Sequence, residues 1–213
     1  MMSCYHKING LYNRDHKTGK FIFGEFCKPE FEYLYENHWI GTEKIDGTNV
    51  RIGYDGQQVT FGGRTEKSQM PVPLLAKLQE LFPIEKLHEV FKNNPAVTLY
   101  GEGYGGNIQA VGPRLSKDFD FILFDVKIGH YWLQHHDMAS IADSLGIKYV
   151  PIRCCGPLSH LEAFVGRGFK SLISEDPDLI SEGLIAVPAI NLLSRNGARI
   201  ITKLKHKDYA GKE

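Results

Sequence analysis

The chain has 213 residues, of which 42% are hydrophobic and 23% are charged, with 25 Lys and Arg balanced by 25 Asp and Glu. This composition and length are typical of one large globular domain, or of one domain with a small appendage, which buries roughly 70% of its unfolded surface without disulfides. The zero formal net charge excludes a generally basic nucleic-acid binder but leaves room for a local basic groove. Residues 1–20 do not resemble a signal peptide, and no apolar run is long enough to span a membrane, so we expect no membrane partner.

Cysteine usage indicates a reducing compartment. The four cysteines, Cys4, Cys27, Cys154 and Cys155, have no metal-ligand spacing. Cys154 and Cys155 follow an apolar run and are predicted to be buried thiols. We therefore expect a cytoplasmic location.

The first elements alternate between strands and turns. Residues 1–37 mix aromatic and charged positions and predict irregular structure with one short strand. An apolar run then leads into residues 42–49. Strand-like runs at 50–54 and 58–61 flank Asp55-Gly56, which is a strong hairpin signal.

Two helices and a strand follow. Leucines recur with helical spacing over residues 73–82, and a second helix is predicted over 84–92 after Pro83. Residues 97–100 predict a strand that leads into Gly101-Glu102-Gly103-Tyr104-Gly105-Gly106. This glycine spacing matches a dinucleotide-binding loop, but that loop must open a helix, and residues 107–113 do not start one. We therefore reject the dinucleotide-binding interpretation.

The second half carries further strands and helices. Residues 119–126 form an apolar run with Asp125 near its end. Asp137 is predicted to cap a helix that Gly146 stops, and Ser159 with Glu162 predicts a capping box. Strands are predicted at 182–187 and 199–205. Because regular βαβ units are missing, the pattern favours an α+β fold with two mostly antiparallel sheets flanked by helices.

Isolated polar residues gather at the predicted strand ends. Lys44 and Asp46 are two residues apart, as are Lys203 and Lys205, so each pair shares one face of a strand. Gly47 lets the backbone turn or lets a ligand approach closely. A lysine can act as a nucleophile if its amine is neutral. Taken singly, these residues also fit surface ion pairs or an exposed strand face.

Six short segments, in order, resemble the motifs of the covalent nucleotidyltransferases, which are the ATP-dependent DNA and RNA ligases and the mRNA capping enzymes. Lys44-Ile45-Asp46-Gly47 resembles the nucleophile motif, residues 63–65 the short arginine motif, and residues 100–105 the third motif. Residues 121–126 resemble the base-stacking strand, 181–185 the glutamate-glycine motif, and 203–205 the terminal lysine pair. The asparagine at position 49 is similar to the RNA ligase 2-like branch, because DNA ligases carry arginine at that position. The aspartate at position 46 is instead similar to the wider ligase pattern.

The resemblance implies an adenylyltransferase core that joins RNA 3′-hydroxyl and 5′-phosphate ends through lysyl-AMP and adenylylated RNA. DNA-containing nicks are a further substrate class that it admits. It implies a single nucleotidyltransferase domain over residues 1–213, without an appended oligonucleotide-binding barrel or C-terminal domain. ATP and Mg²⁺ or Mn²⁺ are the implied cofactors.

The resemblance also implies a role for each matched residue. Lys44 is the nucleophile, and Lys203 and Lys205 donate to the α-phosphate. Asp46 and Glu182 hold the metal through water. The remaining ATP-binding positions are the backbone of Thr42 and Glu43 at the adenine edge, Asn49 near the lysine or pyrophosphate, Arg64 at the ribose or a phosphate, Glu102 at the ribose and Phe124 stacked on adenine.

Three alternatives stay open at this stage. The chain could be a minimal ATP-dependent DNA ligase, a GTP-using capping-type guanylyltransferase, or a non-catalytic nucleotide-binding module. His135 and His136 with Asp137 suggest a metal pair, although a surface or helix-cap role is the stronger interpretation. Arg195, Arg199, His206 and Lys207 fit a phosphate track or a solvated edge equally well, and Tyr104 fits RNA contact or packing.

Overall fold

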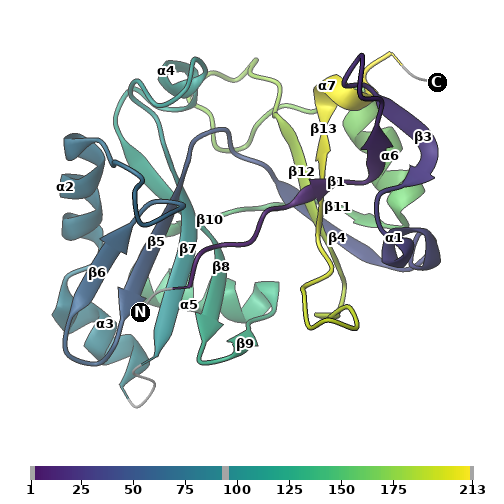
Figure 1. Ribbon diagram of the computed structural model, residues 1–213. Helices are drawn as coiled ribbons and strands as arrows, with labels where there is room; N and C mark the ends of the chain where they lie inside the picture. The colour runs from purple at the N-terminus through teal and green to yellow at the C-terminus, as the bar shows by residue number, and fades with distance from the viewer. Residues whose placement is uncertain (1–2, 93–95, 212–213) are drawn as a thin grey trace. The chain divides into compact units, whose positions relative to one another are not determined.

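The computed structural model describes residues 3–92 and 96–211, which form two compact units (Figure 1). Unit 1 comprises Met1–His6, Asp46–Val150 and Ile173–Asp176. Unit 2 comprises Lys7–Ile45, Pro151–Leu172 and Pro177–Glu213. The chain therefore passes from unit 2 to unit 1 directly after Lys44 and Ile45, in the middle of the predicted nucleophile motif.

Unit 1 is built on a six-stranded sheet in which β10-β8-β7-β5-β6 are neighbours and β9 pairs with β8. Its strands are β5 (Thr48–Tyr54), β6 (Val59–Gly62), β7 (Val97–Tyr104), β8 (Asp120–Ile128), β9 (Tyr131–Trp132) and β10 (Lys148–Tyr149). All pairs are antiparallel except β10 with β8. Its helices are α2 (Val72–Leu81), α3 (Ile84–Phe91), α4 (Gly112–Leu115) and α5 (His135–Leu145).

The core of unit 1 lies between this sheet and its helices. In Figure 1, α2 packs against β8, and α5 packs against β8 and β10. The buried residues include Ile52, Leu74, Leu78, Leu87, Leu99, Phe121 and Leu145. α2 buries Leu74 and Leu78, and α3 buries Leu87 and Phe91, as the spacing of these two helices predicts.

Unit 2 is built on a five-stranded sheet in the order β1-β13-β12-β4-β11, with a separate β2-β3 pair. Its strands are β1 (Asn9–Gly10), β2 (Tyr12–Arg14), β3 (Phe21–Phe26), β4 (Trp39–Glu43), β11 (Ile152–Gly156), β12 (Gly183–Pro188) and β13 (Thr202–Lys205). β1 pairs with β13 in parallel, and the other strand pairs in the described part of unit 2 are antiparallel. Its helices are α1 (Pro29–Tyr33), α6 (Leu158–Arg167) and α7 (His206–Tyr209), and α6 packs against β11 and β13.

Most predicted elements are confirmed. The hairpin of β5 and β6 turns at Asp55, whose Oδ1 accepts from the backbone N–H of Gln57 at 2.9 Å and of Gln58 at 2.8 Å. Such an Asx turn is the reason an Asp-Gly pair predicts a hairpin. The predicted α+β fold of two mostly antiparallel sheets flanked by helices is also confirmed.

The N-terminal prediction is wrong, because the described part of this segment, residues 3–37, contains three strands and a helix rather than one short strand. Asn9 in β1 pairs with Thr202 in β13, a partner that no local pattern reveals. Aromatic residues of β2 and β3 pack on one another, with the Tyr12 and Phe26 ring centroids 5.0 Å apart. Long-range pairing thus organises a segment whose local pattern is weak.

Both predicted helix caps are wrong, although Gly146 does stop α5 in the left-handed conformation. α5 starts two residues before Asp137, which lies in the first turn, where a carboxylate is favourable to the helix dipole. α6 starts at Leu158 after Pro157, so Ser159 is already inside the helix. The paired cysteines were also mispredicted, since Cys154 is buried but Cys155 is exposed on the other face of β11.

Glu162 does not cap α6 but forms a half-buried cluster with two tyrosines in unit 2. Its Oε2 accepts from the hydroxyls of Tyr35 at 2.5 Å and Tyr12 at 3.2 Å. Burial raises the pKa of Glu162, and these two hydrogen bonds oppose the shift without cancelling it. A raised pKa means that the folded state loses stability as the pH rises through the folded-state pKa.

We therefore expect Glu162→Gln, which keeps an acceptor oxygen but no charge, to stabilise the protein more at about pH 8 than at about pH 4, relative to the original chain. Thermal unfolding of both proteins at the two pH values measures this difference. An equal shift in Tm at both values would show that the charge of Glu162 is not the cause.

Candidate active site

Three neighbouring strand ends of unit 2 bring the predicted lysines and glutamate together. Lys44 follows β4 directly, and its backbone N–H donates to the carbonyl of Gly183 at 2.9 Å. Gly183 starts β12 and pairs with Lys205, the last residue of β13. Lys44, Glu182 and Lys205 therefore meet at one end of these three neighbouring strands.

The three side chains form a compact ion cluster. Lys44 Nζ lies 2.5 Å from Glu182 Oε2, and Lys205 Nζ lies 2.5 Å from Glu182 Oε1. Their side chains are only 20%, 18% and 24% exposed, for Lys44, Glu182 and Lys205 respectively. Both carboxylate oxygens of Glu182 thus accept from an ammonium group.

This cluster carries more positive than negative charge. Burial disfavours the carboxylate of Glu182, but Lys44 and Lys205 outweigh it and lower the pKa of Glu182. Lys203 shares the half-buried face of β13 with Lys205. Burial, and then repulsion from Lys205 and Lys44, lowers the pKa of Lys203. The cluster is therefore crowded with positive charge, which suits it to an anion.

We expect Lys203→Met to raise the Tm of the protein, because it removes a charge that the fold disfavours. The same change should slow any reaction on a phosphate held here, because one donor is lost. Thermal unfolding and AMP-attachment rates measure the two effects, with Lys207→Met as an exposed control nearby. A lower Tm for Lys203→Met, or an unchanged rate, would contradict this account.

The cluster depends on a glycine at position 183. Gly183 has φ +148°, and a Cβ there would lie 1.9 Å from the carbonyl oxygen of Leu204. Glu182 therefore enters the sheet through a conformation that a side chain would block. This explains in physical terms why glycine follows the glutamate.

In unit 1, Asn49 and Glu102 are cross-strand neighbours. They stand opposite each other in the antiparallel pair of β5 and β7. Asn49 Oδ1 is buried, and it finds no hydrogen-bond partner within residues 3–92 and 96–211. The predicted nucleotide residues of this unit thus include a buried acceptor beside a carboxylate.

The turn after Asp46 packs closely on β7. A Cβ at position 47 would lie 2.3 Å from the carbonyl oxygen of Gly103 and 2.8 Å from Cγ of Glu102. Gln109 Nε2 also donates to the carbonyl of Gly47 at 3.2 Å. Gly47 is therefore required by close packing. The sequence had singled out Gly47 but not Gln109, whose contact carries no local signal.

Phe124 lies at an irregularity in β8. The register between β7 and β8 shifts there, since Tyr100 pairs with Asp125 and Gly101 with Leu123. The half-buried Phe124 ring meets Tyr5 edge-on, with centroids 5.1 Å apart, and Tyr5 Oη donates to Asp125 Oδ2 at 2.5 Å. Asp125 is thus held by a tyrosine that sequence reasoning missed.

Arg64 is exposed at the end of the β5-β6 hairpin. The preceding carbonyl, of Gly63, accepts from Nε of the fully buried Arg51 at 2.6 Å. Arg51 was also missed, although an arginine inside an apolar strand is itself a signal for a buried, paired charge. Arg51 fixes the backbone from which Arg64 projects.

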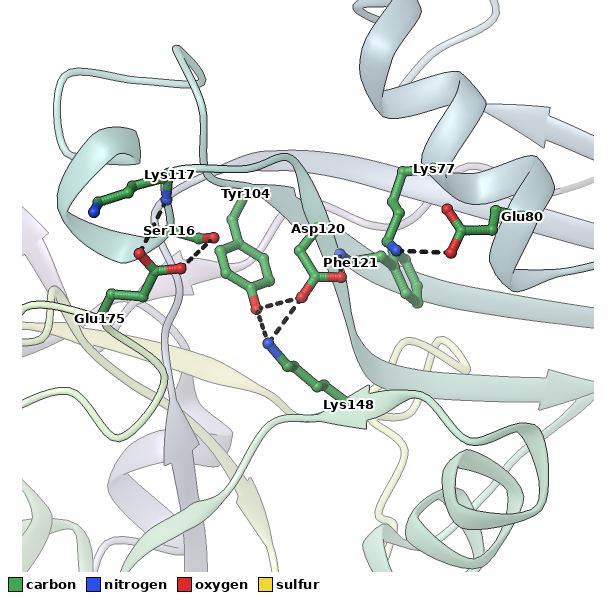
Figure 2. Close-up of polar contacts among 9 residues, drawn as sticks. All are labelled: Lys77, Glu80, Tyr104, Ser116, Lys117, Asp120, Phe121, Lys148 and Glu175. Atoms are coloured by element: carbon green, nitrogen blue, oxygen red, sulfur yellow. Dashed lines mark hydrogen bonds and ion pairs between the residues drawn. The ribbon is translucent and has the colours of Figure 1, made fainter.

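Tyr104 packs rather than projecting to a partner. It is fully buried, and Figure 2 shows its hydroxyl beside Asp120 and Lys148. Tyr104 Oη donates to Asp120 Oδ2 at 3.1 Å and accepts from Lys148 Nζ at 3.1 Å. Burial, followed by the charge of Asp120, raises the pKa of Tyr104 to about 12.

Glu175 connects two segments of unit 1. Its Oε1 accepts from Ser116 Oγ at 2.9 Å (Figure 2), which ties residues 173–176 to α4 and its following loop.

The other residues that the sequence suggested for a metal or phosphate site are structural or surface residues. His135 Nε2 lies 3.0 Å from the carbonyl of Val150, and His136 pairs with Asp137 at the surface. His206 Nδ1 lies 2.8 Å from the carbonyl of Val165, and Arg199 is buried, so these two do not form a solvated edge. Arg195 and Lys207 are exposed.

The described residues lack two further kinds of feature. In the described part of the chain, no helix has the length and apolar character needed to cross a membrane. Residues 3–92 and 96–211 also contain no group of three or more His, Cys, Asp or Glu side chains placed to hold a metal ion.

The structure thus brings Lys44, Glu182 and Lys205 into direct contact in unit 2, with Lys203 on the same face and Thr42 and Glu43 on the adjoining strand. It places Asp46, Asn49, Arg64, Glu102 and Phe124 in unit 1, on or beside strands β5 to β8.

Comparisons with known proteins agree with this fold. The solved structures that match include RNA ligases of Naegleria gruberi. One mutant with ATP and Mn has 20% identity and a TM-score of 0.70, over 98% of this chain and 57% of that one. A form with PPi has 22% identity and a TM-score of 0.65, over 85% and 53%. A mutant with AMP and Mn has 20% identity and a TM-score of 0.65, over 87% and 54%.

These likenesses establish a shared fold, and this chain spans a little over half the length of those enzymes. No curated protein matches the sequence. The family model described as RNA ligase matches residues 37–205, which include the ion cluster of unit 2 and the nucleotide-residue candidates of unit 1. The chain belongs to the RNA ligase family.

Proposed function

We propose that this chain is an ATP-dependent RNA ligase that joins RNA 3′-hydroxyl and 5′-phosphate ends. The observation that carries the proposal is the contact of Lys44, Glu182 and Lys205 at three adjoining strand ends. Membership of the RNA ligase family supports it. The Naegleria structures described as having ATP, AMP or PPi also support it, because ATP is the substrate of lysine adenylylation, PPi is its leaving group, and AMP is the group that is transferred and finally released.

In the first step, the neutral amine of Lys44 attacks the α-phosphorus of ATP. A nitrogen–phosphorus bond forms, the bond to the pyrophosphate oxygen breaks, and pyrophosphate leaves. Because Lys44 Nζ donates to Glu182 in this structure, the amine must lose a proton and turn away from Glu182 before it attacks. Lys203 and Lys205 donate to the α-phosphate, where negative charge develops.

In the second step, an oxygen of the RNA 5′-phosphate attacks the phosphorus of lysyl-AMP, and Lys44 leaves with its nitrogen. In the third step, a 3′-hydroxyl attacks the RNA 5′-phosphorus, and AMP leaves as the phosphodiester forms. Arg64, which is exposed and cationic, is placed on the nucleotide or RNA phosphate in this scheme.

Motif positions assign further residues to the nucleotide. Phe124 stacks on adenine, an interaction worth about 1–3 kcal/mol per base in nucleic-acid complexes. Glu102 accepts from a ribose hydroxyl, and its cross-strand neighbour Asn49 orients the lysine or the pyrophosphate. The backbone of Thr42 and Glu43 reads the adenine edge.

A divalent metal fits this chain through water rather than directly. Both oxygens of Glu182 accept from ammonium groups in this structure, so we place the water molecules of a hydrated ion, rather than the ion itself, against this carboxylate. Asp46 and Glu182 are the proposed holders of Mg²⁺ or Mn²⁺. When bound, the ion neutralises phosphate charge and favours the neutral amine of Lys44.

We expect AMP labelling from ATP and no labelling from GTP. An acceptor placed for the adenine amino group would face the carbonyl of guanine, and a buried mismatch of this kind is unfavourable. Incubation with each radiolabelled nucleotide and a divalent metal measures this choice. Equal labelling from both nucleotides would favour a capping-type guanylyltransferase.

The proposal is tested by sealing nicked duplexes and single strands that carry a 5′-phosphate, with RNA or DNA on the 3′-hydroxyl side. ATP-dependent sealing with RNA on the 3′-hydroxyl side is the expected result. Sealing of all-DNA nicks with equal or higher efficiency would instead support a minimal DNA ligase.

A further inference from the structure

A buried ion pair lies behind the nucleophile, on the other face of its strand. Side chains alternate along β4 and into Lys44, so Glu43 points away from the face that carries Lys44. The Glu43 side chain is only 1% exposed, and its Oε2 lies 3.7 Å from Nη1 of Arg153, whose side chain is 14% exposed. No phosphate-binding role in the scheme above uses this pair.

A shift in the register between β11 and β4 places Arg153 at this position. Ile152 pairs with Thr42 and Cys154 with Gly41, so Arg153 is the extra residue of a bulge. Bulges commonly redirect a side chain in this way. The guanidinium stacks over the Phe169 ring at 5.1 Å, and Nη2 donates to the carbonyl of Lys170 at 3.2 Å.

Glu43 and Arg153 together connect three segments of unit 2, which are β4, β11 and residues 170–172. Glu43 Oε2 accepts from the backbone N–H of Leu172 at 3.1 Å, while the Glu43 backbone N–H donates to Pro151 at 3.0 Å. The pair thus ties the end of β4 to β11 and to residues 170–172. The residue that follows this anchored end is Lys44.

Stability does not explain the pair. Among residues 3–92 and 96–211, Glu43 Oε1 and Arg153 Nη1 are buried with no hydrogen-bond partner. Desolvating two charges is costly, and attraction repays the cost only when the remaining donors and acceptors are satisfied. A neutral pair of similar volume would therefore be at least as stable here.

We propose that Glu43 and Arg153 are positioning residues, which fix the end of β4 so that Lys44 meets the α-phosphate in line. This inference rests on the proposed function. Neither side chain touches ATP in it. Their effect comes through the backbone, where a displacement of about 1 Å is enough to slow a reaction by about 100-fold.

The test compares four proteins with the original chain: Arg153→Met, Glu43→Gln, the double variant Glu43→Gln/Arg153→Met, and Asp178→Asn. Met keeps much of the apolar stem of Arg153, and Gln keeps an acceptor for the Leu172 N–H. Asp178→Asn is the matched control, because it removes an exposed ion pair with Lys170 on the same segment. For each protein, Tm and the rate of AMP attachment are measured across a range of ATP concentrations.

Arg153→Met is expected to lower both Tm and the maximal rate, the latter by about tenfold or more, with a smaller change in the ATP concentration for half-maximal rate. The double variant should recover the Tm of the original chain while its rate stays low. Asp178→Asn should change neither. Recovery of both Tm and rate in the double variant would overturn the proposal, as would single variants with an unchanged rate.

Failure of the inference differs from failure of the proposed function. If the original chain attaches no AMP, the proposed function fails, whatever the variants do. Hydrogen exchange at the Leu172 amide then still reports on the ion pair, because Glu43→Ala should speed that exchange and Asp178→Asn should not.

Discussion

Lys44→Ala is expected to abolish attachment of AMP and all ATP-dependent sealing, while the protein stays folded. The Lys44 side chain ends in a partly exposed ion cluster and not in the core, so its removal leaves packing unchanged. AMP attachment is followed with radiolabelled ATP, and folding is followed by circular dichroism and Tm.

Two comparisons sharpen this prediction. Lys67→Ala, at an exposed lysine in unit 1, should leave AMP attachment unchanged. RNA that already carries a 5′-AMP should still be sealed by Lys44→Ala without ATP, because the third step needs no lysine nucleophile. Retained AMP labelling in Lys44→Ala would place the nucleophile elsewhere and break the motif assignment.

Gly183→Ala is expected to destabilise the protein by more than about 3 kcal/mol, because it combines backbone strain with a direct clash. The new Cβ would lie 1.9 Å from Leu204 O and 2.8 Å from Cα of Lys205, so β12 and β13 must separate. Chemical unfolding measures the loss of stability, and AMP attachment should be lost with it because Glu182 and Lys205 move apart.

Gly197→Ala separates the two causes. Gly197 also has a positive φ, of +79°, but a Cβ there meets nothing within 4 Å. It should therefore show only the backbone strain, about 1–2 kcal/mol. Equal destabilisation by the two substitutions would show that crowding against β13 is not the main effect.

The sequence pattern correctly predicted the elements that depend on neighbouring residues alone. The Asp55-Gly56 hairpin, the leucine-spaced helices α2 and α3, and the apolar strand β8 all appear as expected. Glu182 and Lys205 were matched to Lys44 by motif order, and their contact follows from strand pairing that periodicity alone does not show.

Partners far apart in sequence account for what local pattern missed. Asn9 pairs with Thr202, Glu43 meets Arg153, and Tyr5 meets Asp125, each across more than 100 residues. Glu162 shows the opposite case, in which a local pattern predicts a contact that does not form. Its carboxylate does not cap α6 but accepts from the hydroxyls of Tyr12 in β2 and Tyr35 in the loop before β4. Tertiary contacts override local preferences at such positions.

Mass spectrometry of the protein after incubation with ATP and Mg²⁺ tests the central claim most directly. The account predicts that the intact chain gains a single AMP, and that peptide mapping places it on Lys44 as an acid-labile phosphoamide. An unmodified chain, or an AMP on any other residue, would contradict it.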